Sequence, residues 1–224
     1  MDPGNIGSAD KASVFESLAT VVKALANGRR LELVELLAQG EHSVEALARM
    51  SGMGVTTVSG HLQTLKQAGL VVTRRERTTI FYRLAGDDVA ELFLAAKRVG
   101  LRRYPELRQT LVEYMEQADG GRTIPSIDPS AVTSEMTVVD VRPREEFDAG
   151  HFPGAVSIPL AELPDRYREL PYGAEVVVYC RGEICSLARE AVRWLSDHGV
   201  DAKAIAEGVV EWRVSKEVDL GVAQ

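Results

Sequence analysis

Cysteine is scarce in this sequence of 224 residues, which contains only Cys180 and Cys185. Two thiols exclude a scaffold held by several disulfides, and they exclude a zinc site with four thiolate ligands within one chain. Two thiols this close together in a reducing compartment are typical of redox or sulfur chemistry. The alternative is that both are small apolar residues of a buried core. The residues around them therefore decide between a chemical and a structural role.

Long apolar segments are also missing, since no uncharged stretch reaches the roughly 18–20 residues that cross a bilayer. The first residues, Met1-Asp2-Pro3-Gly4-Asn5, include no basic or apolar region of the kind that begins a secretory signal. We therefore expect a cytoplasmic protein with no membrane partner. Apolar residues make up 45% and charged residues 26% of the chain, which excludes disorder and fibrous architectures.

Basic residues are outnumbered, with 26 Lys and Arg against 33 Asp and Glu and a formal charge of -7. This balance argues weakly against a protein that coats nucleic acid, but it does not exclude a local basic surface. The length allows one large domain or two compact ones. The pattern of predicted elements changes near the middle of the chain, from mainly helices to alternating strands and helices, and this change favours two domains.

The first half has the periodicity of amphipathic helices, with Asn27 and Ser43 as suitable N-caps. Two β-branched and aromatic segments then predict a hairpin, and a long helical stretch follows with a break or kink at Pro105. The predicted helices are Lys11 to Ala26, Arg29 to Ala38, Val44 to Met50, Val55 to Ala68 and Asp87 or Asp88 to about Gln117, and the predicted strands are Leu70 to Arg74 and Thr79 to Leu84.

The segment Asp119-Gly120-Gly121-Arg122 is typical of a linker. We place the first domain at residues 1–118, the linker at 119–125 and the second domain at 126–224. In the second domain strands alternate with helices, which favours an α/β fold with a parallel sheet. The predicted strands are Thr137 to Val141, Val156 to Pro159, Glu175 to Cys180 and Ala202 to Ala206, and the predicted helix is Ser186 to His198.

Two short helices joined by a glycine turn and followed by a hairpin predict a winged helix-turn-helix, whose second helix enters a DNA major groove. Residues 61–83 carry five basic residues and one acidic residue on an otherwise acidic chain, which indicates a phosphate-facing surface. The alternative is a solvated hairpin on an ordinary helical domain. The candidate DNA-contacting residues are Thr56, Thr57, Ser59, His61, Gln63, Lys66, Arg74, Arg75 and Arg77.

Three segments carry a resemblance to a known family: KALANGRR at residues 23–30, SVEALA at 43–48 and VSGHLQTLKQAGLV at 58–71. Together they resemble the ArsR family of winged-helix repressors, over roughly residues 11–117. The resemblance implies a homodimer that pairs through the first and last long helices. It also implies that this dimer binds a pseudo-palindromic operator of double-stranded DNA.

The sequence departs from the metal-sensing members of that family, which carry cysteines before the recognition helix or Asp and His pairs on the last helix. Where those members carry cysteines before the recognition helix, this chain has Glu41-His42-Ser43-Val44-Glu45. No histidine occurs between His61 and His151. We expect His42 to be a surface residue rather than a ligand. We therefore predict no metal site and no bound cofactor.

Four further segments occur in order in the second half: VDVRPREEF at residues 139–147, GHFPGA at 150–155, VYCRGEICS at 178–186 and EGVVEW at 207–212. They resemble a rhodanese domain over about residues 123–220. The resemblance implies a sulfurtransferase-type site at Cys180. In this family His151 is more often structural than a general base, and Trp212 is most simply a core aromatic residue.

The chemistry also follows from the residues, because Cys180 ends an apolar strand before a short loop that opens a helix near Ser186. Backbone N–H groups of such a loop form an anion-binding nest, which would lower the pKa of Cys180 from about 8.5 toward neutrality. Its thiolate could take the outer sulfur of thiosulfate, a persulfide or a polysulfide and hold it as a persulfide. Arg181 is the expected contact of an anionic donor.

Other residues are expected to support this site. We expect Asp140 to accept hydrogen bonds that shape the loop, and Arg142 to pair with Glu145 or Glu146. Cys185 adds a second thiol that could form a disulfide with Cys180 or simply fill an apolar space. The predicted loop residues around the sulfur are Gly182, Glu183, Ile184, Cys185 and Ser186.

A phosphatase of the same fold needs arginine six residues after the cysteine, where this chain has Ser186, so phosphatase activity is not expected. Three hypotheses remain for the whole chain. The second domain is a sensor that controls DNA binding, or a working sulfurtransferase whose expression the first domain regulates, or an idle scaffold. The intact segment around Cys180 argues against the third, and the sequence does not separate the first two.

Overall fold

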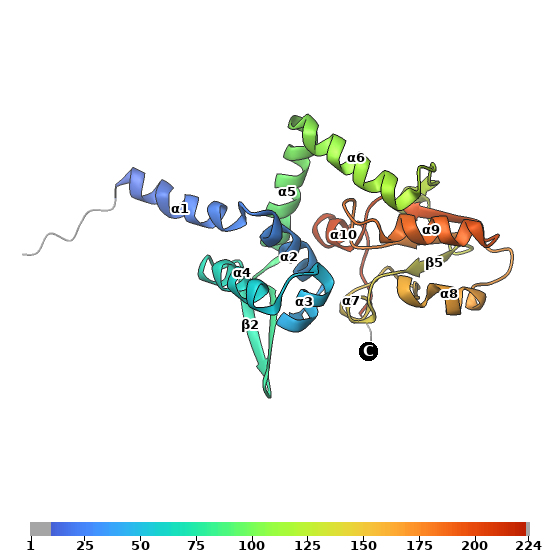
Figure 1. Cartoon of the computed structure of the whole chain (residues 1–224), viewed down its shortest axis with the longest axis horizontal. Coiled ribbons are helices and arrows are strands. Elements are labelled where there is room, and N and C mark those ends of the chain that lie inside the picture. The colour runs from blue at the N-terminus through green and yellow to red at the C-terminus, as the bar shows by residue number, and fades with distance from the viewer. Residues whose placement is uncertain (1–9, 223–224) are drawn as a thin grey trace, which may run out of the picture.

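The computed structural model describes residues 10–222, and its N-terminal half has the predicted winged helix-turn-helix fold (Figure 1). Helix α4 follows α3 across a turn at Gly52, whose positive φ of 65° suits glycine. The elements are α1 (Lys11–Leu25), α2 (Gly28–Gln39), β1 (His42–Ser43), α3 (Val44–Ser51), α4 (Val55–Gln67), β2 (Val71–Glu76), β3 (Thr79–Leu84), α5 (Asp87–Arg103) and α6 (Pro105–Asp119).

The expected N-caps are present in this half. The Asn27 side chain accepts a hydrogen bond from the Arg30 backbone at 3.2 Å, and the Ser43 hydroxyl accepts one from the Ala46 backbone at 3.2 Å. Strands β2 and β3 form an antiparallel hairpin, which projects from the body as the wing (Figure 1). The predicted break also occurs, because α5 ends at Arg103 and Pro105 begins α6.

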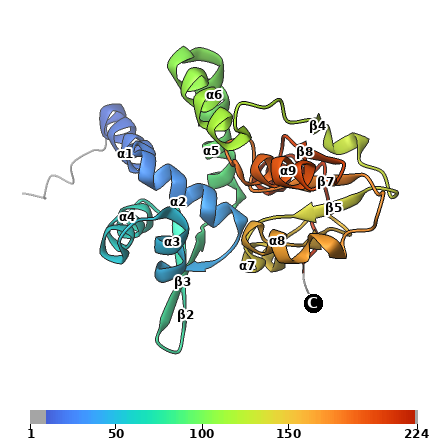
Figure 2. The ribbon, with the colours of Figure 1, turned by 45° about the vertical axis from the view of Figure 1, so that its right-hand side comes forward.

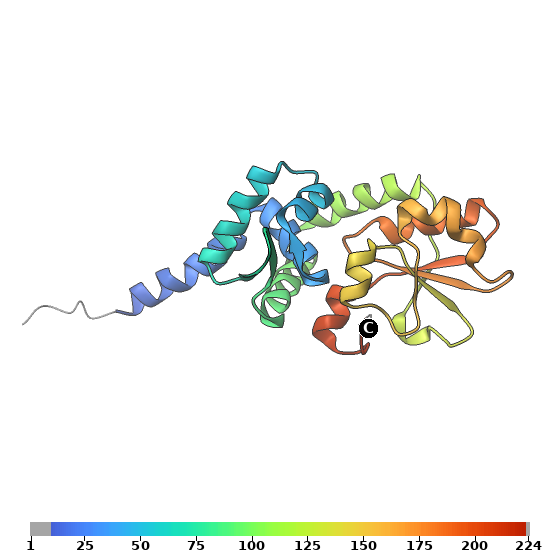
Figure 3. The same ribbon diagram turned by 90° about the horizontal axis from the view of Figure 1, so that it is seen from below.

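The C-terminal half is the predicted α/β domain, with a parallel sheet in the order β4-β8-β7-β5-β6. Figure 3 shows this sheet edge-on beside its helices. The elements are β4 (Ser126–Ile127), β5 (Thr137–Asp140), α7 (Arg144–Ala149), β6 (Val156–Ser157), α8 (Leu163–Arg166), β7 (Val176–Tyr179), α9 (Leu187–Asp197), β8 (Ala202–Ile205) and α10 (Val209–Ser215).

The cores of this half lie on the two faces of the sheet. Trp212 is fully buried and packs on Tyr179 with ring centroids 5.2 Å apart, as expected of a core aromatic residue. His151 stacks on Phe147 at 3.9 Å, and its ring nitrogen lies 2.9 Å from the Phe147 carbonyl. Within residues 10–222, no helix is both long enough and apolar enough to cross a membrane.

His42 is buried, with 4% of its surface exposed, so its predicted surface position is wrong. The two-residue strand β1 pairs His42 with Tyr82 of the wing, and this pairing draws the imidazole inward. Burial lowers the pKa of His42, which favours the neutral ring at physiological pH.

The two halves pack against each other. Val210 of α10 belongs to the hydrophobic core of the N-terminal half, and α6 runs along α9. Helix α2 ends against α7 (Figure 2), where a Cβ atom on Gly40 would lie 2.6 Å from the Ala149 side chain. The expected linker begins at the last residue of α6, and the domain bounds drawn around it stay a prediction.

Candidate functional site

Residues 180–186, which we call the cysteine loop, connect β7 to α9 at the carboxyl edge of the sheet. The buried strand β7 brings Cys180 to this edge with only 2% of its surface exposed. Its Sγ lies 3.4 Å from the Cys185 carbonyl oxygen, and the two thiols are within hydrogen-bonding reach of each other. Both cysteines are free thiols in this structure. The loop therefore holds a close, reduced pair.

The pKa values of the two thiols differ from the expectation. Burial raises the pKa of Cys180, and its hydrogen bond to Cys185 acts in the same direction. Cys185 has a lowered pKa because the Cys180 thiol donates to it and because Arg181 lies nearby. The predicted low pKa of Cys180 is therefore wrong for the reduced loop, since burial outweighs the nest. The negative charge of the pair is favoured on Cys185.

The expected nest of backbone N–H groups is nevertheless present. The amides of Ala188 and Gly182 act on Cys180 to lower its pKa, and those of Arg181 and Leu187 act on Cys185. These donors come from the loop and from the first turn of α9, and they are divided between the two sulfurs, two at each.

Asp140 lies at the end of β5 and organises a buried network beside the loop. Its carboxylate accepts hydrogen bonds from the Arg142 backbone at 2.9 Å, the Arg142 guanidinium at 2.6 Å and the Tyr179 hydroxyl at 2.6 Å. The predicted pairing of Arg142 with Glu145 or Glu146 is wrong. Asp140 and Arg142 have no exposed side-chain surface, and both belong to the framework under the loop.

Glu146 instead pairs with Arg181, whose guanidinium donates to it at 2.7 Å. The Glu146 side chain is fully buried and that of Arg181 is 14% exposed. The pair neutralises both charges. Arg181 therefore does not extend freely toward an incoming donor, in contrast to the expectation from the sequence. Its guanidinium also lies 3.8 Å from the Met50 sulfur of α3.

Three polar residues of the N-terminal half contact the cysteine loop, at Arg181, Glu183 and Ser186. Gln39 at the end of α2 donates to the Arg181 carbonyl at 3.5 Å. Lys97 of α5 forms an ion pair with Glu183 at 3.1 Å. Tyr114 of α6 donates to the Ser186 hydroxyl at 3.1 Å. Each contact comes from a different helix of the winged-helix half.

Gln39 and Lys97 also reach the framework behind the loop. The Gln39 oxygen accepts from Arg142 at 3.0 Å, and Lys97 forms a second ion pair with Glu211 of α10. Sequence reasoning missed both residues. The available signal is a polar side chain at a position where helical periodicity predicts burial: Gln39 follows the apolar residues 36–38, and Lys97 lies one turn after Phe93.

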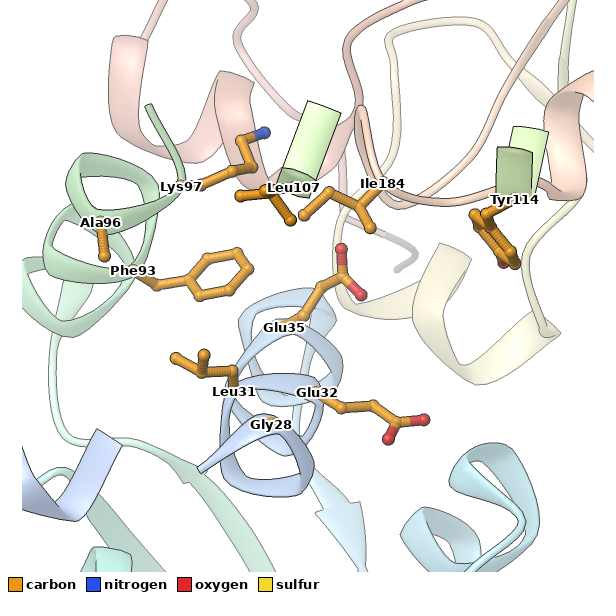
Figure 4. A pocket seen from close by; sticks show the side chains of 10 residues that line it. All are labelled: Gly28, Leu31, Glu32, Glu35, Phe93, Ala96, Lys97, Leu107, Tyr114 and Ile184. Atoms are coloured by element: carbon orange, nitrogen blue, oxygen red, sulfur yellow. The ribbon is translucent and has the colours of Figure 1, made fainter. Parts of the chain in front are cut away.

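A cavity of about 430 Å³ lies between α2, α5, α6 and Ile184 of the cysteine loop. Figure 4 shows the Glu35 side chain rising from α2 into this cavity, toward Ile184, with Phe93 and Leu107 beside it. Burial raises the pKa of Glu35 to about 7. This carboxyl is therefore close to half-protonated at neutral pH.

Replacing Glu35 by glutamine should stabilise the protein only at neutral and higher pH. Because the folded pKa is raised, the unfolded carboxyl ionises first as pH increases from about 4.5 to 7, and the folded state loses stability across that window. Above it, we expect the variant to be more stable by roughly 1–3 kcal/mol. Urea unfolding at pH 5 and pH 8 measures the difference. Glu32→Gln on the same helix is the control, and parallel pH profiles for parent and Glu35→Gln would contradict the expectation.

The candidate DNA-contacting residues lie on α4 and the wing, and most are exposed. Two of them are engaged within the half: Gln63 donates to the Tyr82 hydroxyl at 3.1 Å, and Lys66 donates to Thr73 at 3.0 Å. Arg74 is held by Glu41 at 2.6 Å and by Glu76 at 2.7 Å. The residues exposed or half-buried on this surface are Thr56, Thr57, Ser59, His61, Gln63, Lys66, Arg74, Arg75 and Arg77.

We expect the Arg75→Ala, Arg77→Ala double variant to weaken binding to all DNA sequences and to reduce the slope of log affinity against log salt by about 2. Both residues lie at the tip of the wing, where Arg77 has a φ of 53° and its carbonyl accepts from Arg75. Fluorescence titrations at several salt concentrations measure the slope. Arg74→Ala should change it less, because two carboxylates already neutralise that side chain. An unchanged slope in the double variant would exclude the wing as a phosphate contact.

Comparisons with known proteins agree with both halves. The family model described as bacterial regulatory protein, arsR family, matches residues 27–73, and that of the rhodanese-like domain matches residues 128–215. The HTH-type transcriptional regulator Rv0324 of Mycobacterium tuberculosis is 44% identical over 205 residues, which cover 92% of this chain and 91% of that protein.

Two shorter relatives match the N-terminal half. The biofilm growth-associated repressor of Agrobacterium fabrum is 46% identical over 78 residues, covering 35% of this chain and 67% of its own. A solution structure of a homodimeric winged helix-turn-helix fragment from Mycobacterium bovis is 49% identical, covers 46% of this chain and 94% of its own, and has a TM-score of 0.41. The chain therefore belongs to the ArsR family of helix-turn-helix transcriptional regulators, and it carries a rhodanese-like domain after its DNA-binding domain.

Proposed function

We propose that this regulator senses sulfane sulfur, by forming a persulfide on Cys180 that changes how the N-terminal half binds its operator. One observation supports this most directly: the cysteine loop is held by α2, α5 and α6 of the DNA-binding half. A loop that only carried sulfur to an acceptor would not need these contacts. A change of charge or shape in the loop would be felt by the helices that position α4.

The first step transfers one sulfur atom to Cys180. Cys185, whose pKa is lowered, is the thiolate of the pair; it accepts the proton of the Cys180 thiol, and the resulting Cys180 thiolate attacks the outer sulfur of the donor. The donor's sulfur–sulfur bond breaks as the new bond to Sγ forms, and its remaining fragment leaves with the electron pair. The loop amides then stabilise the terminal sulfur anion.

Cys185 allows a second step. Its thiol can attack Sγ of the Cys180 persulfide, which forms a disulfide between the two residues and releases hydrosulfide. No external oxidant is required, because the donated sulfur leaves as the reduced product. The persulfide and disulfide forms differ in charge and shape, as a two-state switch requires.

The functional unit is proposed to be a homodimer on double-stranded DNA. Helix α1 extends away from the rest of the described chain (Figure 1). One of its faces exposes large apolar residues. Val14, Phe15, Leu18 and Val22 are each more than half exposed, at 61%, 59%, 57% and 54%. Their spacing forms one helical stripe, which a second copy would cover.

The test is an operator titration with and without prior treatment by a persulfide donor, paired with intact mass measurement. The DNA is a duplex selected by the full-length protein from a random pool. We expect the treated protein to gain about 32 Da, one sulfur atom, and to change its operator affinity at least about tenfold. Full sulfur uptake with unchanged affinity would contradict sensing and favour a sulfurtransferase that only regulates its own expression.

A further inference from the structure

The second cavity at the cysteine loop has a volume of about 580 Å³, and Cys180 and Cys185 both line it. Its apolar wall is formed by Leu111, Val112 and Met115 of α6. The lining also includes Ile124 of the linker and Ala188 and Ile205 of the rhodanese-like domain. The DNA-binding half therefore supplies one wall of the space through which a donor reaches the thiols.

The charges around this cavity do not favour the binding of a doubly negative donor such as thiosulfate. Its two arginines are both paired, Arg122 with Asp197 and Arg189 with Asp119. Glu116 and Glu183 add negative charge to the lining, and Lys97, the partner of Glu183, is shared with Glu211. Among the residues that the structure describes, the lining thus offers no arginine that is free of a carboxylate.

The loop itself provides no additional positive charge. Arg181 is occupied by the buried Glu146 carboxylate, and the backbone N–H groups act on the two sulfurs of the cysteine pair. Thiosulfate would bring a sulfonate group with no basic partner and next to Glu116 and Glu183, at a cost that grows as water is excluded.

We infer that the donor is an organic persulfide with an uncharged, apolar body, and that α6 binds this body while Cys180 takes the outer sulfur. This inference rests on the proposed function and names its substrate class. The transfer is balanced: the Cys180 thiolate attacks the outer sulfur of R–S–SH, the donor's S–S bond breaks, and R–S⁻ leaves and takes the donor proton to become R–SH. No oxidant or reductant takes part.

The experiment compares three donors on the full-length protein: N-acetylcysteine methyl ester persulfide, its free-acid counterpart N-acetylcysteine persulfide, and thiosulfate. The first two differ by one carboxylate, so their ratio isolates the effect of charge. The measurement is the initial rate of the one-sulfur mass gain. We expect the ester to react at least about tenfold faster than the acid, and thiosulfate to be the slowest.

A charge reversal on α6 tests the same point from the protein side. Glu116→Lys should increase the rate with thiosulfate severalfold and leave the ester rate within about twofold. Glu113→Lys, on the same helix but outside the cavity lining, is the matched control and should change neither rate. Equal or faster labelling by thiosulfate in the parent protein would overturn the inference and leave the proposed function standing. No labelling by any donor would overturn both.

Discussion

Replacing Cys180 by serine should lower the rate of sulfur uptake at least about tenfold, because a serine hydroxyl is not ionised at neutral pH and is a poor nucleophile toward sulfur, which leaves Cys185 as the one thiol of the loop. Cys180 is the thiol at the end of β7, with loop amides and the first turn of α9 directed at it. The measurement is intact mass before and after reduction, since a persulfide sulfur is lost on reduction.

Cys185→Ser is the matched control for this prediction. It should still gain one sulfur, although more slowly, because the proton acceptor for Cys180 is lost. It should not form the disulfide, so its persulfide should accumulate where the parent protein releases hydrosulfide. Sulfur transfer by Cys180→Ser at the parent rate would refute the assignment. Donor-treated parent protein that shows only a Cys180 persulfide and a free Cys185 thiol at every dose would exclude the disulfide step.

The Arg142→Met substitution is expected to lower the free energy of unfolding strongly. This change removes the buried guanidinium that neutralises Asp140 and leaves a fully buried carboxylate without its ion-pair partner. Removing one partner of such a pair typically destabilises a protein by about 3–5 kcal/mol. It also removes the hydrogen bonds from Arg142 to Gln39 and to the Gly150 carbonyl. Urea unfolding measures the loss.

Arg144→Met is the control for this change, two residues away in the sequence. Arg144 pairs with Asp148 on the surface, where the arginine side chain is 62% exposed. Surface pairs of this kind contribute at most about 1 kcal/mol, so the control should unfold almost like the parent protein. If the two variants lost similar amounts of stability, the buried network would not be the reason for the effect.

The long elements could be predicted from the sequence because their signals are local. Helical periodicity and side-chain caps such as Asn27 and Ser43 place α2 and α3 to within one or two residues. Of the two-residue strands, β6 lies within the predicted segment Val156 to Pro159, whereas β1 and β4 were not predicted because no longer apolar stretch surrounds them. The burial of His42 accompanies the pairing of β1, so it was missed as well.

The positions of the cysteines and of Asp140 could be predicted at one edge of the sheet, but their electrostatic partners could not. Arg142 pairs with Asp140 and Arg181 with Glu146, a choice that depends on how β5, α7 and the cysteine loop pack. The pKa of Cys180 was predicted with the wrong sign because its degree of burial is a tertiary property. The contacts of Gln39, Lys97 and Tyr114 with the second half depend on domain packing in the same way.

Those three contacts affect whether the two domains of this protein can be separated and joined to other domains. Joining this rhodanese-like domain to another winged-helix domain through the Gly120-Gly121 segment would keep the nucleophile, although Val210 of α10 would lose the core in which it packs. It would lose the matches of Gln39 with Arg142, Lys97 with Glu183 and Tyr114 with Ser186. A chimera of this kind should still accept sulfur but respond to it with unaltered DNA binding. The two domains therefore have to be inherited together for sulfur uptake to affect DNA binding. Recombining them with other domains would give proteins that take up sulfur and bind DNA without coupling between the two.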